Sequence, residues 1–325
     1  MKIIQFKDAI REAMIEEMKK NLNIFLIGEE IGRHGGVFKV SKNMLNKFSK
    51  KRIIDTPISE LGFTGLGIGA AMNGLRPIVE FMTFNFSLIA IDQIINSAAK
   101  IRLMSGGQFS IPIVFRGPTG SAIMLGSQHS QNFENWYANC PGLKVIIPSN
   151  PYDAKGLLKS AIRDNDPTIF MESELMYNDL GKIPTKEYLI PIGKAMIKNY
   201  GKDITIVSFG KMIKIILEAN NYIKEEGIEL EIIDMRTVRP LDINCIINSI
   251  KKTKKLIIVE ESWPLGSIAS EITYQIQKNA FNYLDSPIYK INSLDIPMPY
   301  SKKLSNAILP NIKKIINVVK KIYYI

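Results

Sequence analysis

Glu60 is the residue whose type and position most clearly suggest chemistry. It lies between a β-rich run, residues 52–57, and a helical segment spaced by glycines, residues 59–69. A single carboxylate therefore stands at a strand-to-helix junction among apolar neighbours, where burial raises a carboxyl pKa and a helix N-terminus lowers it. The balance decides whether such a group can share a proton with a ligand nitrogen. The alternative is a glutamate that caps the helix at the protein surface.

Histidine is scarce in this chain, which contains only His34 and His129. His129 lies in a polar loop, residues 126–131, after a glycine-rich turn. An imidazole that titrates near neutral pH suits proton transfer at such a place. The alternative is a loop histidine whose ring binds backbone carbonyls. His34 lies in a glycine-containing loop that we expect to be flexible, and we assign it no role.

Several nucleotide and hydrolase motifs are poorly matched or missing. Gly65, Gly67 and Gly69 have the spacing of a dinucleotide fingerprint, but residues 62–74 favour a helix, and no acidic residue clearly ends a second strand about 20 residues later. The sequence has no Walker phosphate loop, no H-E-x-x-H and no G-x-S-x-G elbow. Nicotinamide enzymes, kinases and hydrolases therefore lose support.

Length and composition indicate an enzyme of two domains. The chain has 325 residues, more than the roughly 250 to 300 of a single core. No apolar run approaches the roughly 20 residues that span a bilayer, and the N-terminal residues lack a signal-peptide pattern. We therefore expect a cytoplasmic protein with no membrane span. Cys140 and Cys245 have no second Cys or His at metal-ligand spacing, so we expect both to be reduced packing residues.

The net charge of +11 raises the question of nucleic-acid binding. That function needs basic residues gathered on one face with aromatic residues between them. Here the basic residues are scattered, and the densest runs, 50–52 and 251–255, look like solvated helix ends. We expect no nucleic-acid partner, although a basic surface favours an acidic protein partner through electrostatic steering.

Strands and helices alternate along the chain, which predicts βαβ crossovers and mainly parallel sheets. The first series includes a helix over 6–20 and one over 86–104, which is apolar on most sides and is expected to be buried between layers. The second series follows the stretch 181–191, the expected domain boundary. The expected strands are 24–28, 53–57, 77–81, 111–115, 144–148 and 168–172, then 204–209, 230–235, 256–260 and 288–291; the later helices are 213–226, 268–278 and one from Pro310.

Parallel sheets bind ligands beyond the carboxyl ends of their strands, where the strand order reverses. Glu60, the run 81–86 and the loop 116–131 all follow expected strands in this way. These three segments are the predicted ligand site.

Five runs of sequence together resemble one enzyme family. They are residues 51–60 (KRIIDTPISE), 75–86 (LRPIVEFMTFNF), 128–131 (QHSQ), 140–145 (CPGLKV) and 236–240 (RTVRP). In this order, over nearly the whole chain, they resemble the β subunit of the pyruvate dehydrogenase component of the 2-oxo acid dehydrogenase complexes. The resemblance implies an α/β fold of two open-sheet domains. A thiamine pyrimidine-binding domain would cover 1–185 and a smaller, transketolase-like C-terminal domain 190–325.

The resemblance also implies roles for individual residues. In this family Glu60 would hydrogen-bond a ring nitrogen of the aminopyrimidine of thiamine diphosphate, and His129 would assist acyl transfer to a lipoyl group. The pyrimidine pocket would be lined by Ile58, Met82 and Phe86, with Glu29 near the ring. Core packing is the alternative for Met82 and Phe86, and a plain loop carboxylate is the alternative for Glu29.

A missing motif implies a partner chain. Thiamine diphosphate enzymes hold magnesium and the diphosphate through a Gly-Asp-Gly run with Asn-Asn about thirty residues later, and this chain has no Gly-Asp-Gly. The resemblance therefore implies that an α subunit supplies that site in an α2β2 tetramer. The β chain alone would be inactive.

Two further sites follow from the resemblance. Backbone carbonyls of Ile113, Ala161, Ile162, Asp164 and Asp166 would hold a monovalent cation, potassium; the alternative is a plain helix terminus followed by turn residues. Asp285 and the terminal carboxylate of Ile325 would dock the dihydrolipoyl acetyltransferase core, although fraying is common at chain ends.

Substrate choice depends on the run 80–86, which resembles the pyruvate-specific branch of the family more than the branched-chain 2-oxo acid branch. The main departure from the family is the loop 121–126, which is bulkier than expected and would alter access for a lipoyl arm. A non-catalytic scaffold that kept the fold is the alternative from another class, and the presence of both Glu60 and His129 argues against it.

Overall fold

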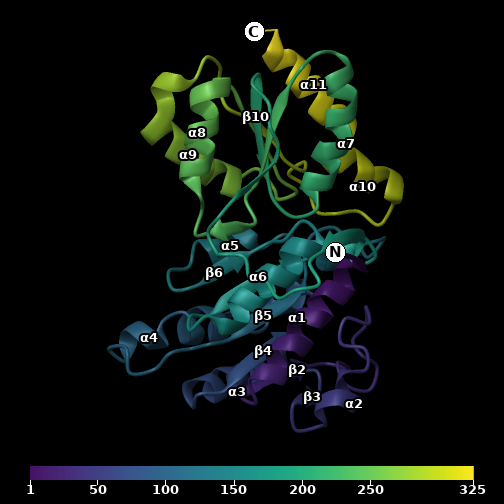
Figure 1. Cartoon of the computed structure of the whole chain (residues 1–325), viewed down its shortest axis with the longest axis vertical. Coiled ribbons are helices and arrows are strands. Elements are labelled where there is room, and N and C mark those ends of the chain that lie inside the picture. The colour runs from purple at the N-terminus through teal and green to yellow at the C-terminus, as the bar shows by residue number, and fades with distance from the viewer. Residues whose placement is uncertain (325) are drawn as a thin grey trace. The chain divides into compact units, whose positions relative to one another are not determined.

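The computed structural model describes residues 1–324, which form two compact units (Figure 1). The first comprises Met1–Thr119 and Trp136–Ile192, and the second comprises Gly120–Asn135 and the chain from Gly193 onwards. The segment that carries His129 thus groups with the second unit, although it lies inside the range 1–185 predicted for the first domain. Both units are α/β with mainly parallel, open sheets, which confirms the predicted fold class. Among the described residues, no helix has both the length and the apolar character needed to cross a membrane.

The sheet of the first unit contains parallel strands in the order β6-β7-β5-β4-β2-β3. Strands β2, β5 and β7 are buried along their whole length, as expected when helices cover both faces of a parallel sheet. The chain passes from β2 to β3 on one side and then to β4 on the other side, so the strand order reverses at β2. The bounds are β2 (Ile24–Gly28), β3 (Ile53–Asp55), β4 (Arg76–Glu80), β5 (Val114–Pro118), β6 (Lys144–Ile146) and β7 (Thr168–Glu172).

Helices cover both faces of this sheet. On one face α1 (Phe6–Lys20) and α6 (Pro151–Arg163) share a core with the strands. On the other face α3 (Glu60–Met72) lies close to the sheet because Gly67 has no side chain. A Cβ at Gly67 would stand 3.0 Å from Val79 Cγ2 and 3.3 Å from Ile113 Cδ1.

The prediction of one buried helix over 86–104 is wrong. The segment forms the 3-10 helix η1 (Phe84–Leu88), the π-helix η2 (Gln93–Ala98) and the short α4 (Ile101–Met104), and Leu103 is 85% exposed. Local hydrogen bonds compete with a regular helix: the Thr83 side chain accepts from Asn85 N, and Ser87 Oγ donates to the Phe84 carbonyl at 2.6 Å. Apolar residues on most sides also favour no single buried face, so they did not specify a continuous helix.

The second unit has a sheet in the order β14-β13-β10-β11-β9, in which only β9 pairs antiparallel among the described pairs. Figure 1 shows α7 and α11 on one face of β10 and α8 and α9 on the other. Helix α8 is fixed to β10 by hydroxyl groups, since Thr205 Oγ1 lies 2.6 Å from both Ser249 Oγ and Thr253 Oγ1. The bounds are β9 (Met196–Asn199), β10 (Ile204–Ser208), β11 (Leu230–Asp234), β13 (Leu256–Val259), β14 (Tyr289–Ile291), α7 (Met212–Glu225), α8 (Ile243–Thr253), α9 (Ile268–Ala280) and α11 (Ile312–Tyr323).

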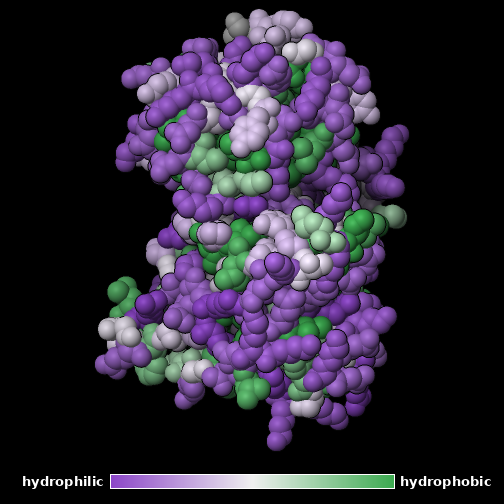
Figure 2. All heavy atoms as spheres, viewed as in Figure 1, coloured by the Kyte–Doolittle hydropathy of each residue, from purple (hydrophilic) through white to green (hydrophobic). Residues whose placement is uncertain are grey.

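Smaller elements complete the two units. The antiparallel pair of β1 (Lys2–Gln5) and β8 (Leu180–Ile183) was not foreseen from the sequence. Hydrophilic residues cover most of the visible surface of each unit, with apolar residues in separate patches (Figure 2). The remaining elements are α2 (Met44–Phe48), η3 (Ser127–His129), α5 (Glu134–Ala138), η4 (Glu174–Met176), β12 (Thr237–Arg239), η5 (Phe281–Tyr283) and α10 (Lys302–Ile308).

Candidate active site

Glu60 is the first residue of α3 and is buried, with 4% of its surface exposed. Its carboxylate accepts no hydrogen bond from the residues that the structure describes, and the preceding Ser59 makes no side-chain cap. The alternative of a surface glutamate that caps the helix is therefore wrong. A buried carboxylate without a partner is costly unless a ligand or another chain satisfies it.

Glu29 follows β2 and forms the second carboxylate of the site. It is 8% exposed, and its Oε1 is buried without a hydrogen-bond partner. Burial raises the pKa of Glu29, and the nearby negative charges of Glu60 and Glu30 raise it further. Glu29 and Glu60 are thus close enough to repel each other when both are ionised, which favours a proton on Glu29.

The predicted pyrimidine-pocket residues follow the carboxyl ends of adjacent strands. Glu29 follows β2, Ile58 and Glu60 follow β3, and Met82 and Phe86 follow β4. These strands are neighbours in the order β4-β2-β3, so the five residues follow strand ends at the edge where the strand order reverses. This is the place at which doubly wound sheets bind ligands.

The apolar members of this set are partly accessible. Met82 and Phe86 are half-buried, while Ile58 is 83% exposed. Phe81 fixes the start of the segment after β4, because its ring packs 5.9 Å from Phe63 of α3 and 5.6 Å from Phe84, centroid to centroid. Core packing stays the alternative for Met82 and Phe86.

A buried ionic row lies across β4, β5 and β7, and the sequence did not reveal it. Arg116 is 1% exposed and donates from Nε and Nη2 to Glu172 at 2.6 and 2.5 Å, and from Nη1 to Glu80. Tyr177 donates its hydroxyl to Glu172 at 2.8 Å. Burial raises the pKa of Glu80. Burial would lower the pKa of Arg116, but the negative charges of Glu172 and Glu80 raise this pKa above its ordinary value. The available signal was a charged residue at or near the end of three otherwise apolar strands.

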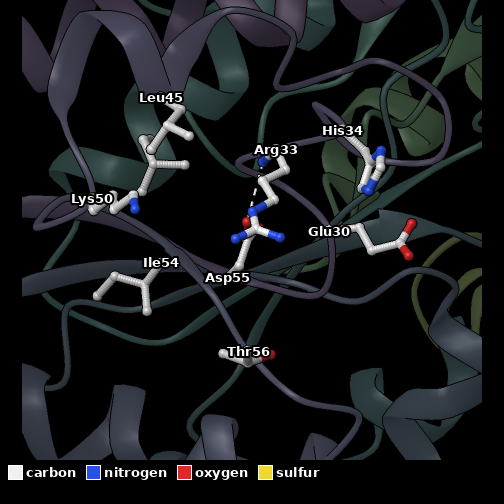
Figure 3. A pocket seen from close by; sticks show the side chains of 9 residues that line it. Glu30, Arg33, His34, Leu45, Lys50, Ile54, Asp55 and Thr56 are labelled. Carbon is white, nitrogen blue, oxygen red and sulfur yellow. Dashed lines mark hydrogen bonds between the residues drawn. The ribbon is translucent and has the colours of Figure 1, made fainter.

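A cavity of about 440 Å³ lies beside the carboxyl ends of β2 and β3. Figure 3 shows Glu30 and His34 on one side, Lys50 and Ile54 on the other, and Arg33 beside Asp55. Asp55 holds this loop by accepting from the backbone N–H of Gly32 at 2.6 Å and of Arg33 at 3.1 Å. None of the five predicted pocket residues lines the cavity, so it neighbours their site and is not part of it.

His129 ends the 3-10 turn η3 and is half-buried. It belongs to the second unit, whereas Glu60 belongs to the first. The structure thus brings the predicted pyrimidine residues to one edge of one sheet and places the predicted acyl-transfer residue in another unit.

The carbonyls of the predicted potassium site already accept hydrogen bonds. The guanidinium of Arg76 donates to Ile162 O at 2.9 Å and to Asp164 O at 2.5 Å. The remaining oxygens receive N–H or O–H donors from their own neighbourhood: Ile113 O from Thr168 N, Ala161 O from Asp164 N and Asp166 O from Thr168 Oγ1. The Asp166 side chain pairs with Lys144 at 3.1 Å and with Arg102. The guanidinium of Arg76 therefore occupies two of the five carbonyls, those of Ile162 and Asp164, and the potassium site stays a prediction.

The predicted docking residues are only partly described. Asp285 is exposed, and its backbone N–H donates to Lys254 O at 3.0 Å. Ile325 lies outside the described residues.

Comparison with known proteins agrees with this geometry. Residues 2–179 match the family described as "Transketolase, pyrimidine binding domain", and residues 193–315 match "Transketolase, C-terminal domain". A solved structure named "Split gene transketolase, inactive beta4 tetramer" superposes with a TM-score of 0.81 at 18% identity, covering 99% of this chain and 98% of the other. This likeness shows the shared fold.

Sequence relatives identify the branch of the fold. "Pyruvate dehydrogenase E1 component subunit beta" of Rhizobium meliloti (strain 1021) is 49% identical over 325 residues, covering 100% of this chain and 71% of the relative. The mitochondrial proteins of that name from Homo sapiens and Dictyostelium discoideum are 50% and 48% identical; they cover 98% and 99% of this chain and 90% and 91% of their own lengths. A chain with such identity over its whole length, and with both domains matched, belongs to the family of pyruvate dehydrogenase E1 component β subunits.

Proposed function

We propose that this chain is the β subunit of a thiamine diphosphate-dependent pyruvate dehydrogenase. With an α subunit it would decarboxylate pyruvate oxidatively and pass the acetyl group to a lipoyl group, which leads to acetyl-CoA. The observation that carries the proposal is the pair of buried carboxylates, Glu60 and Glu29, at the reversal of strand order in a chain of this family.

The residues present fit the aminopyrimidine of thiamine diphosphate. An aminopyrimidine offers flat apolar faces and polar edge atoms, and the site offers half-buried Met82 and Phe86 together with two carboxylates. The buried Oε1 of Glu29 and the carboxylate of Glu60 lack partners among the described residues, so both remain available to a ligand. When bound, thiamine diphosphate supplies the electron sink for decarboxylation of the 2-oxo acid.

Within this chain Glu60 would hydrogen-bond a ring nitrogen of the aminopyrimidine and so favour one tautomer of the ring. Glu29 is the neighbouring carboxyl group, and its pKa is raised by burial and by the negative charges of Glu60 and Glu30. Met82, Phe86 and the exposed Ile58 orient the ring and exclude water from its faces. His129 assists transfer of the acetyl group to the incoming lipoyl group.

A partner chain completes the site. The sequence has no Gly-Asp-Gly run, and the described residues contain no group of three or more His, Cys, Asp or Glu side chains placed to hold a metal. We therefore assign magnesium and the diphosphate to an α subunit in an α2β2 tetramer. The exposed Ile58 fits a surface that another chain covers.

The finer assignments rest on the family resemblance. Pyruvate is the proposed substrate, with branched-chain 2-oxo acids as the alternative, and the dihydrolipoyl acetyltransferase core is the proposed assembly partner, docked through the surface that includes Asp285. Bound potassium belongs to the same set of proposals, and a cytoplasmic location is a separate proposal that does not depend on the resemblance. A non-catalytic scaffold is the alternative from another class, and the buried Oε1 of Glu29, which has no partner, argues against it because a scaffold gains nothing from this cost.

The test is coexpression with the cognate α subunit and assay of thiamine-dependent pyruvate decarboxylation. We expect Glu60→Gln to lower kcat by about 100-fold to 10,000-fold, the range of general acid–base catalysis, with the tetramer intact. Glu229→Gln is the matched control, because Glu229 lies in an exposed ion pair with Lys202. Unchanged turnover in Glu60→Gln would remove the proposed mechanism. If the wild-type tetramer decarboxylates branched-chain 2-oxo acids in preference to pyruvate, a branched-chain acid replaces pyruvate as the proposed substrate.

A further inference from the structure

The loop that carries His129 is closed on itself. Gly120 N donates to Gln131 O at 2.9 Å, and Ala122 N donates to Ser130 Oγ at 3.3 Å. Two hydrogen-bonded contacts thus join the ends of the segment 120–131, as in a compact Ω-type loop. His129 directly precedes Ser130, so its backbone is fixed wherever this closure is fixed.

One charged pair of the second unit holds this closure. The backbone N–H of Ser121 donates to Glu261 Oε1 at 2.5 Å, and Lys211 Nζ lies 2.5 Å from Glu261 Oε2. Lys211 also donates to Ser121 Oγ. Lys211 and Glu261 follow the carboxyl ends of the adjacent strands β10 and β13, so the central sheet of the unit places both of them.

A second attachment holds the middle of the loop. Ser127 Oγ donates to Met298 O at 2.8 Å. Gly126 lies so close to Tyr300 that a Cβ there would stand 2.6 Å from the ring. His129 therefore lies between two fixed points, the attachment at Ser127 on one side and the closure at Ser130 and Gln131 on the other.

The surroundings of the charged pair are acidic and buried. Burial and the negative charges of Glu260 and Glu261 together raise the pKa of Glu134 to about 8, against a backbone hydrogen bond and the charge of Lys211, which lower it. Burial also raises the pKa of Glu260, against hydrogen bonds from the Asn292 side chain and the backbone N–H of Ala269. With Glu134 largely protonated at neutral pH, the Lys211 ammonium is left to Glu261. The pair is almost fully enclosed, so removal of one member leaves an unpaired buried charge.

We propose that Lys211 and Glu261 are positioning residues for His129, fixing the closed loop 120–131 in the geometry that acetyl transfer to a lipoyl group requires. The inference rests on the proposed function of His129. It extends that function to two residues that lie far from His129 in the sequence and that act through Ser121.

The test uses the α2β2 holoenzyme and two assays. Decarboxylation with an artificial electron acceptor does not need the lipoyl group, whereas acetylation of a lipoyl domain, followed by mass spectrometry, does. We expect Glu261→Ala and Lys211→Met to lower kcat for lipoyl acetylation by at least about tenfold, within the hundredfold that a misplacement of about 1 Å can cost. Decarboxylation should stay within about twofold, and Lys211→Arg should recover most of the acetylation, because a guanidinium can also bridge Glu261 and Ser121.

Controls separate this inference from the function on which it rests. Lys202→Met removes a lysine from an exposed ion pair of the same unit and should leave both assays unchanged. Glu261→Gln keeps an acceptor for Ser121 N and is the milder variant if Glu261→Ala does not assemble. Hydrogen exchange of the 120–131 peptides should accelerate in Lys211→Met.

Three results would overturn the positioning role: normal lipoyl acetylation in Lys211→Met, equal losses in the two assays, or no recovery with Lys211→Arg. If His129→Ala itself acetylates the lipoyl domain normally, the role of His129 fails, and with it the inference. If the wild-type holoenzyme does not decarboxylate pyruvate, the proposed function fails.

Discussion

Replacement of Arg116 by methionine should destabilise the first unit strongly. Arg116 is fully buried between Glu80 and Glu172, whose side chains are 10% and 0% exposed. The methionine side chain fills much of the same volume but leaves two carboxylates near each other with no cation. Breaking a buried ion pair by removing one partner costs about 3 to 5 kcal/mol. We expect a loss in that range at pH 7.

The loss should grow with pH. Burial already raises the pKa of Glu80 with Arg116 present, and the Arg116→Met variant loses the attraction that opposes this rise. A carboxyl group whose folded-state pKa exceeds its unfolded value holds extra protons in the folded state, so stability falls as pH rises above the unfolded value. The limit is about 1.4 kcal/mol per pH unit for each such group. The deficit at pH 8 should therefore exceed the deficit at pH 5.

Native-state hydrogen exchange of amides in β4, β5 and β7 is the suitable assay, because a chain of two units need not unfold in one step. Lys2→Met is the control in the same unit, since the Lys2–Glu12 pair is partly exposed and such pairs contribute about 0 to 1 kcal/mol. Adding Glu80→Gln and Glu172→Gln to Arg116→Met should restore part of the stability by removing the buried charges. A deficit below about 1 kcal/mol, or one that shrinks as pH rises, would refute the reasoning.

Three further predictions concern other parts of the chain. Glu134→Gln should flatten the pH dependence of the second unit's stability. The pKa of Glu134, about 8, lies above the ordinary value of 4.5, so the wild type loses stability as pH rises between these two values. Thermal unfolding of the wild type and the variant from pH 5 to 8 measures the difference. Glu29→Gln should stabilise the cofactor-free chain more at pH 8 than at pH 5, because the raised pKa of Glu29 makes its ionised form unfavourable. An equal effect of the substitution at both pH values would contradict the burial of a charge at this position. Gly126→Ala should destabilise the second unit more than Gly227→Ala. Both glycines have positive φ, +77° and +79°, but only at Gly126 would a Cβ meet a ring, that of Tyr300. Similar unfolding temperatures for the two variants would show that the Tyr300 ring moves aside at little cost.

Much of the fold follows from the sequence because parallel strands buried on both faces are short apolar runs between helical segments. The strands over 24–28 and 168–172 and the helix over 6–20 have the predicted bounds. The segment 84–104 was not predictable in the same way, because its turns depend on local side-chain hydrogen bonds of Thr83 and Ser87. The pairing of β1 with β8 was also not predicted, because the two strands are about 180 residues apart and neither is a buried apolar run.

The residues of the candidate site also differ in how far the sequence alone reveals them. Glu60 could be found from its place at a strand-to-helix junction, and its burial agrees with the reasoning. Arg116, Glu172, Lys211 and Glu261 could not be found, because each depends on a partner distant in the sequence and meets it only through the order of strands in a sheet. The roles of the predicted residues, the cation site and the docking surface remain predictions.

The closed loop 120–131 has a consequence for how this protein can vary. Because the loop is bonded at Ser121 to Glu261 and at Ser127 to Met298, residues 123–125 between these attachments can change in size and number with little effect on the strands that flank the loop. Loop length itself costs little, about 0.6 kcal/mol for each doubling. The exposed apolar tip at Ile123, Met124 and Leu125 is therefore a part that natural selection can remodel on its own while the folded framework is retained.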